Sequence, residues 1–355
     1  MSADESAPAF HNPHDLSLLR TEENLDEVTA LADEHGGRVG LGRALEELNR
    51  RAELTKVPGQ LVEGGFTWNP ADQATQRWWP QGITTSADAS DREDHDGRRL
   101  VMTSWYSKTV DGENHGARIS VIDIDTLAYR HVLIVEPTES FGRPAMKPLN
   151  VHAGGLVWCG PFVHIAGTRR GIFTCRLDDI IEVEPSSETF GYRFVLPVSF
   201  AYDGQSLDAA QRMRYSFLSL DRSSAPPQLV AGEYGISRDR EVTKRLIRFP
   251  LDPETFHLRA EQDGRSRPIR LDDAGVGHMQ GAAYVDGQYY VTTSRGRWRL
   301  GNLVIGTPGN WRRIPRALPV GPEDITYWPS QQAFWSLSEY PKHRYVFSVK
   351  RSALG

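Results

Sequence analysis

Three side chains in this sequence have the properties that acid–base chemistry needs. His152 begins the stretch His-Ala-Gly-Gly, and the acids Glu323 and Asp324 follow Pro322. An imidazole beside a carboxylate titrates near neutrality, which suits proton transfer in a lactone hydrolysis, a lyase step or a cyclisation. We therefore predict that His152 and one of the acids, Glu323 or Asp324, are catalytic. Adjacent residues on a strand face opposite sides, so only one of the two acids can reach a common site.

Seven further residues are predicted to bind the substrate. Two glutamines and a second histidine would orient it, aromatic side chains would wall it, and one carboxylate stands where other repeats carry a hydroxyl group. These residues are Gln81, Gln280, His278, Trp79, Trp105, Tyr215 and Glu233. A concave site with an aromatic wall and a few convergent polar groups is typical of a ligand pocket. A structural role remains open for the polar residues, which could bind ordered water or tie strands together.

Two other chemistries stay open for the same residues. A divalent metal could be held by Glu323 or Asp324, by His152 and by the amide oxygens of Gln81 or Gln280. An aromatic wall with a carboxylate could stabilise a cationic intermediate through cation–π attraction. The sequence itself requires no cofactor.

The elements that must position these residues form an internal repeat. Four segments share a polar or small tetrad, then strand-like residues, at 79–85, 152–158, 278–284 and 321–327. Second strands are expected at 100–103, 162–166, 289–293 and 333–337. Third strands are expected at 119–125, 172–178, 246–252 and 344–350, with a weaker copy at 302–306. Fourth strands are expected in places, at 129–135 and 192–197.

A degenerate unit fills the gap between the second and third of these segments, with strands at 214–220 and 228–233. The chain then has five four-stranded units whose first strands start near residues 81, 154, 214, 280 and 323. Radial repetition of four-stranded sheets is typical of a β-propeller. We predict an all-β fold, a five-bladed β-propeller, with six blades or a β-sandwich pair as alternatives.

The N-terminal region is different in kind. Residues 1–20 are expected to be a loose, disordered tail, and apolar residues then recur at helical spacing on both sides of Gly36-Gly37. We assign residues 1–57 to this tail and a helical hairpin arm. Residues 58–355 are assigned to the propeller, which a strand near residues 61–68 would close.

Composition narrows the classes of function. Lys and Arg total 41 against 46 Asp and Glu, a formal charge of −5, which argues against a nucleic-acid partner bound by a basic face. No apolar run is long enough to cross a membrane, and the N-terminus lacks the apolar core of a signal peptide, so a cytoplasmic location is expected. Cys159 and Cys175 are expected to be free thiols. A local basic patch at residues 295–299 could meet a phosphate or carboxylate, although a solvated loop is favoured.

The repeat resembles a group of actinobacterial β-propeller proteins of uncharacterised function, often described only as secreted proteins. The matching pieces are Trp79-Pro80-Gln81-Gly82-Ile83-Thr84, His152-Ala153-Gly154-Gly155, Arg214-Tyr215-Ser216-Phe217, Met279-Gln280-Gly281 and Gly321-Pro322-Glu323-Asp324. This resemblance implies a fold but no settled activity. A looser likeness to the gluconolactonase and strictosidine-synthase families is architectural only.

Two classes of function remain. The favoured interpretation is an enzyme, an acid–base lyase, cyclase or lactone-type hydrolase of specialised metabolism, with a small-molecule ligand in the central channel. The alternative is a non-catalytic propeller that binds a glycan or a protein. The predicted channel residues differ from one repeat to the next, which indicates one asymmetric site and counts against a multivalent lectin.

Overall fold

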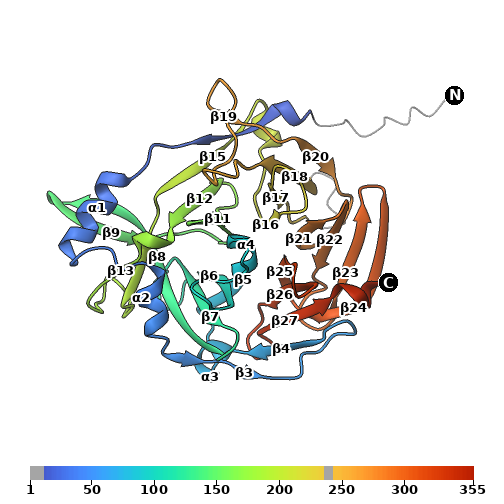
Figure 1. Cartoon of the computed structure of the whole chain (residues 1–355), viewed down its shortest axis with the longest axis horizontal. Helices are drawn as coiled ribbons and strands as arrows, with labels where there is room; N and C mark the ends of the chain where they lie inside the picture. Colours follow the sequence, from blue (N-terminus) through green and yellow to red (C-terminus); the bar gives the residue numbers. More distant parts are fainter. Residues whose placement is uncertain (1–11, 236–242) are drawn as a thin grey trace.

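The strands of the chain form sheets arranged around a common centre (Figure 1). The computed structural model describes residues 12–235 and 243–355. Within these residues there are five sheets, and we number them by the chain order of their innermost strands, β5, β10, β16, β21 and β25.

The first sheet contains β5 (Trp78–Thr85), β6 (Leu100–Ser107), β7 (Ala117–Asp123), β8 (Ala128–Ser140), β14 (Phe194–Pro197) and β13 (Ile181–Glu182), with β9 (Arg143–Pro148) and β2 (Arg50–Arg51) also paired to β8. The second contains β10 (Leu156–Cys159), β11 (Phe162–Ala166), β12 (Ile172–Arg176), β15 (Phe200–Ser206), β1 (Leu16–Arg20) and β19 (Arg265–Ser266). The third contains β16 (Phe217–Asp221), β17 (Gln228–Gly232), β18 (Arg245–Pro250) and β20 (Arg270–Asp273).

The fourth sheet contains β21 (Met279–Val285), β22 (Gln288–Thr293), β23 (Leu300–Thr307) and β24 (Asn310–Val320). The fifth contains β25 (Pro322–Trp328), β26 (Ala333–Ser338), β27 (Tyr345–Lys350), β4 (Gly64–Thr67) and β3 (Glu53–Leu54). The helices of the described residues are α1 (Leu25–Glu34), α2 (Gly40–Glu46), α3 (Pro70–Ala74) and α4 (Ser86–Ala89), with 3-10 turns η1 (Pro13–Asp15), η2 (Leu177–Asp179), η3 (Ala209–Gln211) and η4 (Arg351–Leu354). None of these helices has the length and apolar character needed to cross a membrane.

The hydrophobic core lies between neighbouring sheets. Each of the five buried clusters draws residues from two consecutive sheets, and one of them joins Ile83 of the first sheet to Trp328 of the fifth. The inner strands also contact one another in chain order, and β25 contacts β5. These contacts close a ring, so the fold is an all-β propeller, as the repeat predicted.

The fifth sheet combines the last strands of the chain with two strands that precede β5. Strand β4 pairs antiparallel with β27, so that Phe66 lies opposite Val346. The segment that precedes the first inner strand therefore supplies an outer strand to the fifth sheet, and backbone hydrogen bonds join the two ends of the ring.

The expectation of a loose tail over residues 1–20 is wrong for its second half. Strand β1 pairs antiparallel with β15 over five residue pairs, and Leu16 and Leu18 are buried. The partner strands lie far away in the sequence, so this short strand carries little local signal. Residues 1–11 lie outside the described residues.

Helices α1 and α2 occur where the apolar spacing predicts them. They bury Val28, Leu31 and Ala32 in α1 and Leu41, Ala44 and Leu45 in α2. Both helices contact β8 of the first sheet, and α1 also contacts β9. The short helix α4 lies near the centre of the ring in Figure 1 and contacts β5, β10 and β25.

The segment 192–197 was expected as the fourth strand of the second unit, and this is wrong. Strand β14 pairs in parallel with β8 of the first sheet, with Val195 opposite Leu133. Strand β15 takes the fourth place of the second sheet, because Phe173 on β12 pairs with Ala201. The segment is a strand, but a long-range pairing decides its sheet.

Glycines of the repeat allow neighbouring inner strands to approach closely. A Cβ atom on Gly82 would lie 2.6 Å from the backbone nitrogen of Leu156 and 2.7 Å from the carbonyl carbon of Gly155. On Gly281 it would lie 2.6 Å from the Cα atom of Asp324. Backbone atoms cannot move aside as a flexible side chain can, so these positions have no room for a methyl group.

Replacing Gly82 by alanine is expected to lower the free energy of unfolding by about 1–3 kcal/mol or more, because overpacking forces two inner strands apart. Urea denaturation monitored by tryptophan fluorescence measures this change. Gly64→Ala is the matched control, since Gly64 is also in a strand but a Cβ atom there meets nothing within 4 Å. Equal effects of the two substitutions would contradict this account of the close approach.

Candidate functional site

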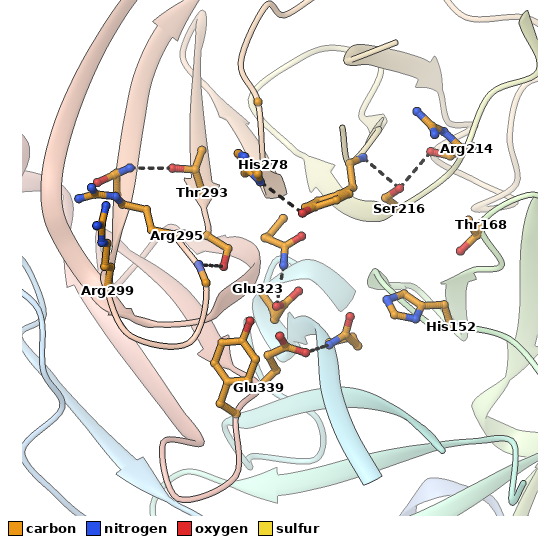
Figure 2. A pocket seen from close by; sticks show the side chains of 18 of the residues that line it. His152, Thr168, Arg214, Ser216, His278, Thr293, Arg295, Arg299, Glu323 and Glu339 are labelled. Carbon is orange, nitrogen blue, oxygen red and sulfur yellow. Dashed lines mark hydrogen bonds between the residues drawn. The ribbon is translucent and has the colours of Figure 1, made fainter. Parts of the chain in front are cut away.

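A cavity of about 1030 Å³ opens where the inner strands begin (Figure 2). Five of the predicted site residues line it: Gln81, His152, His278, Gln280 and Glu323. Segments at the start of all five inner strands contribute to the lining, because Arg214 and Ser216 precede β16. The structure therefore brings together half of the ten predicted residues at one end of the ring.

Glu323 lies on the inner wall of this cavity with only 3% of its surface exposed. One of its carboxyl oxygens accepts a hydrogen bond of 2.7 Å from the Nε2 amide of Gln280. Burial, and then the nearby charge of Glu339, raise the pKa of Glu323 well above its usual value. These surroundings favour the protonated form of Glu323 at the wall of the cavity.

Glu339 is the second carboxyl group of the cavity, and the sequence analysis missed it. The Nε2 amide of Gln81 donates a hydrogen bond of 3.2 Å to Glu339. Burial raises the pKa of Glu339, whereas hydrogen bonds from Tyr340 and Gln81 and the charge of Lys108 oppose that shift. Figure 2 shows Glu323 and Glu339 near each other. Each accepts a hydrogen bond from a glutamine, Glu323 from Gln280 and Glu339 from Gln81.

A signal for Glu339 exists in the sequence. Lys108, Glu233, Ser294 and Glu339 directly follow the second strands of their sheets, and Thr168 comes one residue later after the second strand of the second sheet. Glu233 and Glu339 are the two carboxylates of this series, and Glu339 holds the place in the last unit that Glu233 holds in the third. Thr168, Ser294 and Glu339 all line the cavity, so this part of the repeat faces the site in three of the five sheets.

His152 lines the cavity without the carboxylate partner that was predicted for it. Its ring stacks at a tilt on Tyr106, with centroids 4.4 Å apart. In the described part of the chain, no carboxylate forms a hydrogen bond or ion pair with His152. Desolvation of the imidazole by the surrounding protein, and then the positive charge of Lys108, lower the pKa of His152 to about 4. The expected carboxylate partner of His152 is therefore wrong, and the direction of the pKa shift favours the neutral imidazole.

Asp324 is placed away from the cavity. It is fully buried, and its Oδ2 atom lies 3.3 Å from the backbone nitrogens of both Ile83 and Leu156. These N–H groups donate from two neighbouring inner strands, so Asp324 ties three strands together. Glu323 lines the cavity and Asp324 does not, so only one of the two adjacent acids reaches the site.

Three predicted aromatic residues do not form the wall of the cavity. Trp105 is fully buried and donates from Nε1 to Thr103 Oγ1 at 3.0 Å. Tyr215 is 1% exposed and belongs to the core between the second and third sheets. Trp79 is buried, and the Nζ atom of Lys108 lies over its ring. Strand ends near the cavity can carry side chains that point into the core, which the sequence position alone does not reveal.

Glu233 is also not a ligand-binding group. It is fully buried and forms a two-pronged ion pair with Arg245, at 2.8 Å from Nη2 and 2.9 Å from Nε. The guanidinium group lowers the pKa of Glu233 against the effect of burial. The carboxylate that replaces a hydroxyl group at this position therefore serves an internal ion pair.

Tyrosines take the place of the predicted aromatic wall. Tyr234 and Tyr340 line the cavity, and the Tyr234 hydroxyl lies 3.3 Å from Nδ1 of His278. In the described residues, no group of three or more His, Cys, Asp or Glu side chains is placed to share a metal ion. The metal alternative stays an untested prediction.

Comparisons with known proteins give only distant likenesses. No protein-family model and no curated protein sequence matches the chain. It is similar to a GH43_1 enzyme from Xanthomonas citri (10% identity, TM-score 0.38, covering 79% of this chain and 89% of that chain). It is also similar to a gluconolactonase from Xanthomonas campestris (12% identity, TM-score 0.34, covering 85% of this chain and 86% of that chain). A third similar structure is the β-propeller domain of Cps50 (Swd1) from Myceliophteria thermophila (9% identity, TM-score 0.36, covering 78% of this chain and 98% of that chain).

These likenesses include a gluconolactonase, as the looser architectural resemblance expected. The resemblance to actinobacterial propeller proteins has no matching sequence and stays a prediction. Structural similarity at these TM-scores carries no conclusion about activity. The function must therefore be inferred from the cavity itself.

Proposed function

We propose that the chain is a small-molecule hydrolase that uses Glu323 and Glu339 as a general acid and a general base in the central cavity. The observation that carries this proposal is the pair of carboxyl groups with raised pKa values that face one open cavity. Carboxyl pairs whose surroundings separate their pKa values are typical of acid and base assignments in enzymes. A lactone-type ester is the favoured class of substrate bond, and a lyase or cyclase step would use the same pair.

The surroundings of the two acids assign their roles. Glu339 receives hydrogen bonds from Gln81 and Tyr340 and lies near the charge of Lys108, so it ionises first. Glu323 accepts a hydrogen bond from Gln280 and faces Glu339. The negative charge of Glu339 favours the protonated form of Glu323. The pair thus shares one proton over a range of pH, and its titration belongs to both groups together.

Each group has a defined task in lactone hydrolysis. Glu339 takes a proton from a water molecule, whose oxygen attacks the carbonyl carbon. The ring C–O bond then breaks, and Glu323 donates its proton to the leaving oxygen. Proton exchange with solvent restores both groups. Gln81 and Gln280 hold the two carboxyl groups in place.

The propeller supplies the rigid frame for this pair. We propose that the five sheets are five blades of one ring, rather than part of a six-bladed one. The contact between β25 and β5, and the core cluster shared by the first and fifth sheets, support this count. The N-terminal helices are proposed as an arm on the first blade, and residues 58–355 as the propeller domain.

Turnover of a substrate panel tests the proposal. The panel contains aldonolactones, 4-nitrophenyl esters and 4-nitrophenyl glycosides, with spontaneous hydrolysis subtracted. Glu339→Gln is expected to lower kcat/KM by about 10²–10⁴-fold, because the base is lost while the side-chain shape is kept. Glu53→Gln, at an exposed strand position, is the control and is expected to keep wild-type turnover.

Two outcomes would contradict the enzyme proposal. Full activity of Glu339→Gln would remove the carboxyl pair from the mechanism. Binding of a panel compound without turnover by the wild-type protein would favour the alternative, a non-catalytic propeller that holds one small ligand.

A further inference from the structure

Three arginines lie on one side of the cavity. Arg295 and Arg299 belong to the loop between β22 and β23, and Arg313 lies on the adjoining strand β24. Figure 2 shows Arg295 and Arg299 beside Thr293, while His152 and Thr168 lie on the opposite side and the two glutamates lie between. The cavity therefore has a cationic side and a carboxyl floor.

These three arginines have no counter-ion among the residues that the structure describes. Within residues 12–235 and 243–355, none of them forms an ion pair, and all three side chains are exposed. Other arginines of the fold are neutralised, as Arg245 is by Glu233 and Arg267 by Asp263. Like charges that converge on a cavity repel one another, and an anion that entered would relieve that repulsion.

The rest of the lining favours a ligand rich in hydroxyl groups. Among the described residues that line the cavity there is no aliphatic side chain, and most carry hydroxyl, amide, carboxyl or guanidinium groups. Asn302 is fixed in place, because its Nδ2 atom donates to Thr293 Oγ1 at 3.2 Å. Such a surface would leave an apolar ligand without contacts, but it offers partners to a sugar-like molecule.

We propose that the cavity selects small polyhydroxylated molecules that carry a carboxylate or a phosphate group, and that Arg295, Arg299 and Arg313 bind this anionic group. Planar guanidinium groups form paired, charge-assisted hydrogen bonds with both anions. Binding at the cationic side places the remainder of the molecule across the floor, towards Glu323 and Glu339. This inference rests on the proposed function for its substrate, but its binding step is independent of turnover.

Isothermal titration with three monosaccharides tests the inference. The probes are glucose, glucuronate and glucose 6-phosphate, which are neutral, carboxylated and phosphorylated. The wild-type protein is expected to bind at least one of the two anions at least tenfold more tightly than glucose, with an affinity that falls as salt is raised. The preferred anion identifies whether a carboxylate or a phosphate is recognised.

Variants locate the binding group. Arg299→Ala, and the triple replacement of Arg295, Arg299 and Arg313 by alanine, are expected to weaken anion binding by about tenfold or more. Arg143→Ala removes one charge from an exposed strand outside the cavity, and Trp298→Ala alters the same loop at a residue that is 91% exposed. Both controls are expected to bind the anions as the wild type does. Thermal midpoints without ligand verify that every variant is folded.

The outcomes separate this inference from the proposed function. Equal binding of glucose and the anions, or unchanged anion binding by the triple variant, would overturn the inference. If one of these outcomes is found but the wild type still hydrolyses neutral lactones and Glu339→Gln does not, the proposed function remains supported without the anion site. Arginine-dependent anion binding without any Glu339-dependent turnover would support the anion site and contradict the hydrolase.

Discussion

Replacing Glu323 by glutamine is expected to lower kcat/KM by about 10²–10⁴-fold and also to raise the thermal midpoint at neutral pH. Glutamine keeps the shape of the side chain, and its carbonyl oxygen can still accept the hydrogen bond from Gln280. It cannot donate the proton that the leaving group needs. It also cannot ionise, so the variant avoids a charge in a buried place.

The direction of the stability change follows from the raised pKa of Glu323. The carboxyl group of the unfolded chain ionises first, near pH 4.5, while the folded protein retains its proton. The wild type therefore loses stability as pH rises from about 4.5 through the raised pKa of the folded state. The midpoints of wild type and Glu323→Gln should coincide near pH 4 and separate towards pH 8.

Asp324→Asn is the matched control, because it removes the neighbouring buried carboxyl group, whose pKa is also raised. Asp324 does not line the cavity, so this variant is expected to keep turnover. Differential scanning calorimetry from pH 4 to pH 8, with turnover measured on the same samples, separates the two effects. A Glu323→Gln protein that is less stable than the wild type at pH 8, or as active, would contradict the assignment.

The repeat could be predicted because each strand carries a local signal. The strand at 162–166 is found at the predicted residues, and 289–293 and 333–337 each extend by one residue. Alternating apolar and polar residues, bounded by turn residues, predict the ends of such strands to within a few residues. Strand β1 could not be predicted in this way, because its pairing with β15 joins segments more than 180 residues apart.

The same difference between local signals and long-range contacts explains which site residues could be predicted. Residues at the start of the inner strands could be placed at one mouth from the repeat, and Gln81, Gln280 and Glu323 are there. Which side chains face one another depends on the arrangement of different sheets around the ring. The sequence therefore paired Glu323 with His152, whereas the structure sets Glu323 against Glu339.

A second buried network, which the sequence analysis did not find, is centred on Asp72. Asp72 on α3 is 5% exposed and accepts hydrogen bonds from Arg118 Nη2 at 3.0 Å, Tyr129 at 2.7 Å and His131 Nε2 at 2.9 Å. Because the ionised Asp72 can only accept, the proton of His131 lies on Nε2, and Nδ1 then accepts from Ser120 Oγ at 2.7 Å. One carboxylate therefore joins α3 to β7 and β8.

Asp72→Asn is expected to lower the free energy of unfolding by about 3–5 kcal/mol, because it leaves the charge of Arg118 buried without a counter-ion. Guanidinium chloride denaturation at pH 7 measures the loss. Asp263→Asn is the control, since Asp263 also pairs with an arginine, Arg267, but on the surface. A surface pair is worth about 0–1 kcal/mol, so the control should change little.

The same network predicts instability in acid. Burial, and then the charge of Arg118, lower the pKa of His131 to about 3, and the neighbouring charges hold the pKa of Asp72 below its usual value. The unfolded chain binds protons at both groups first. Stability should therefore fall as pH drops below about 6.5 through His131, and further below about 4 through Asp72. This acid-dependent loss should be smaller in Asp72→Asn, which lacks the carboxylate.

A double variant distinguishes an unpaired charge from a general packing defect. Arg118 lies between the rings of Trp78 and Trp105, with its guanidinium carbon 4.5 and 4.6 Å from their centroids. Methionine can fill that space without a charge. If the buried charge causes the loss, Asp72→Asn combined with Arg118→Met should be more stable than Asp72→Asn alone. A double variant that is less stable than the single one would assign the loss to the hydrogen bonds and packing of Asp72 instead.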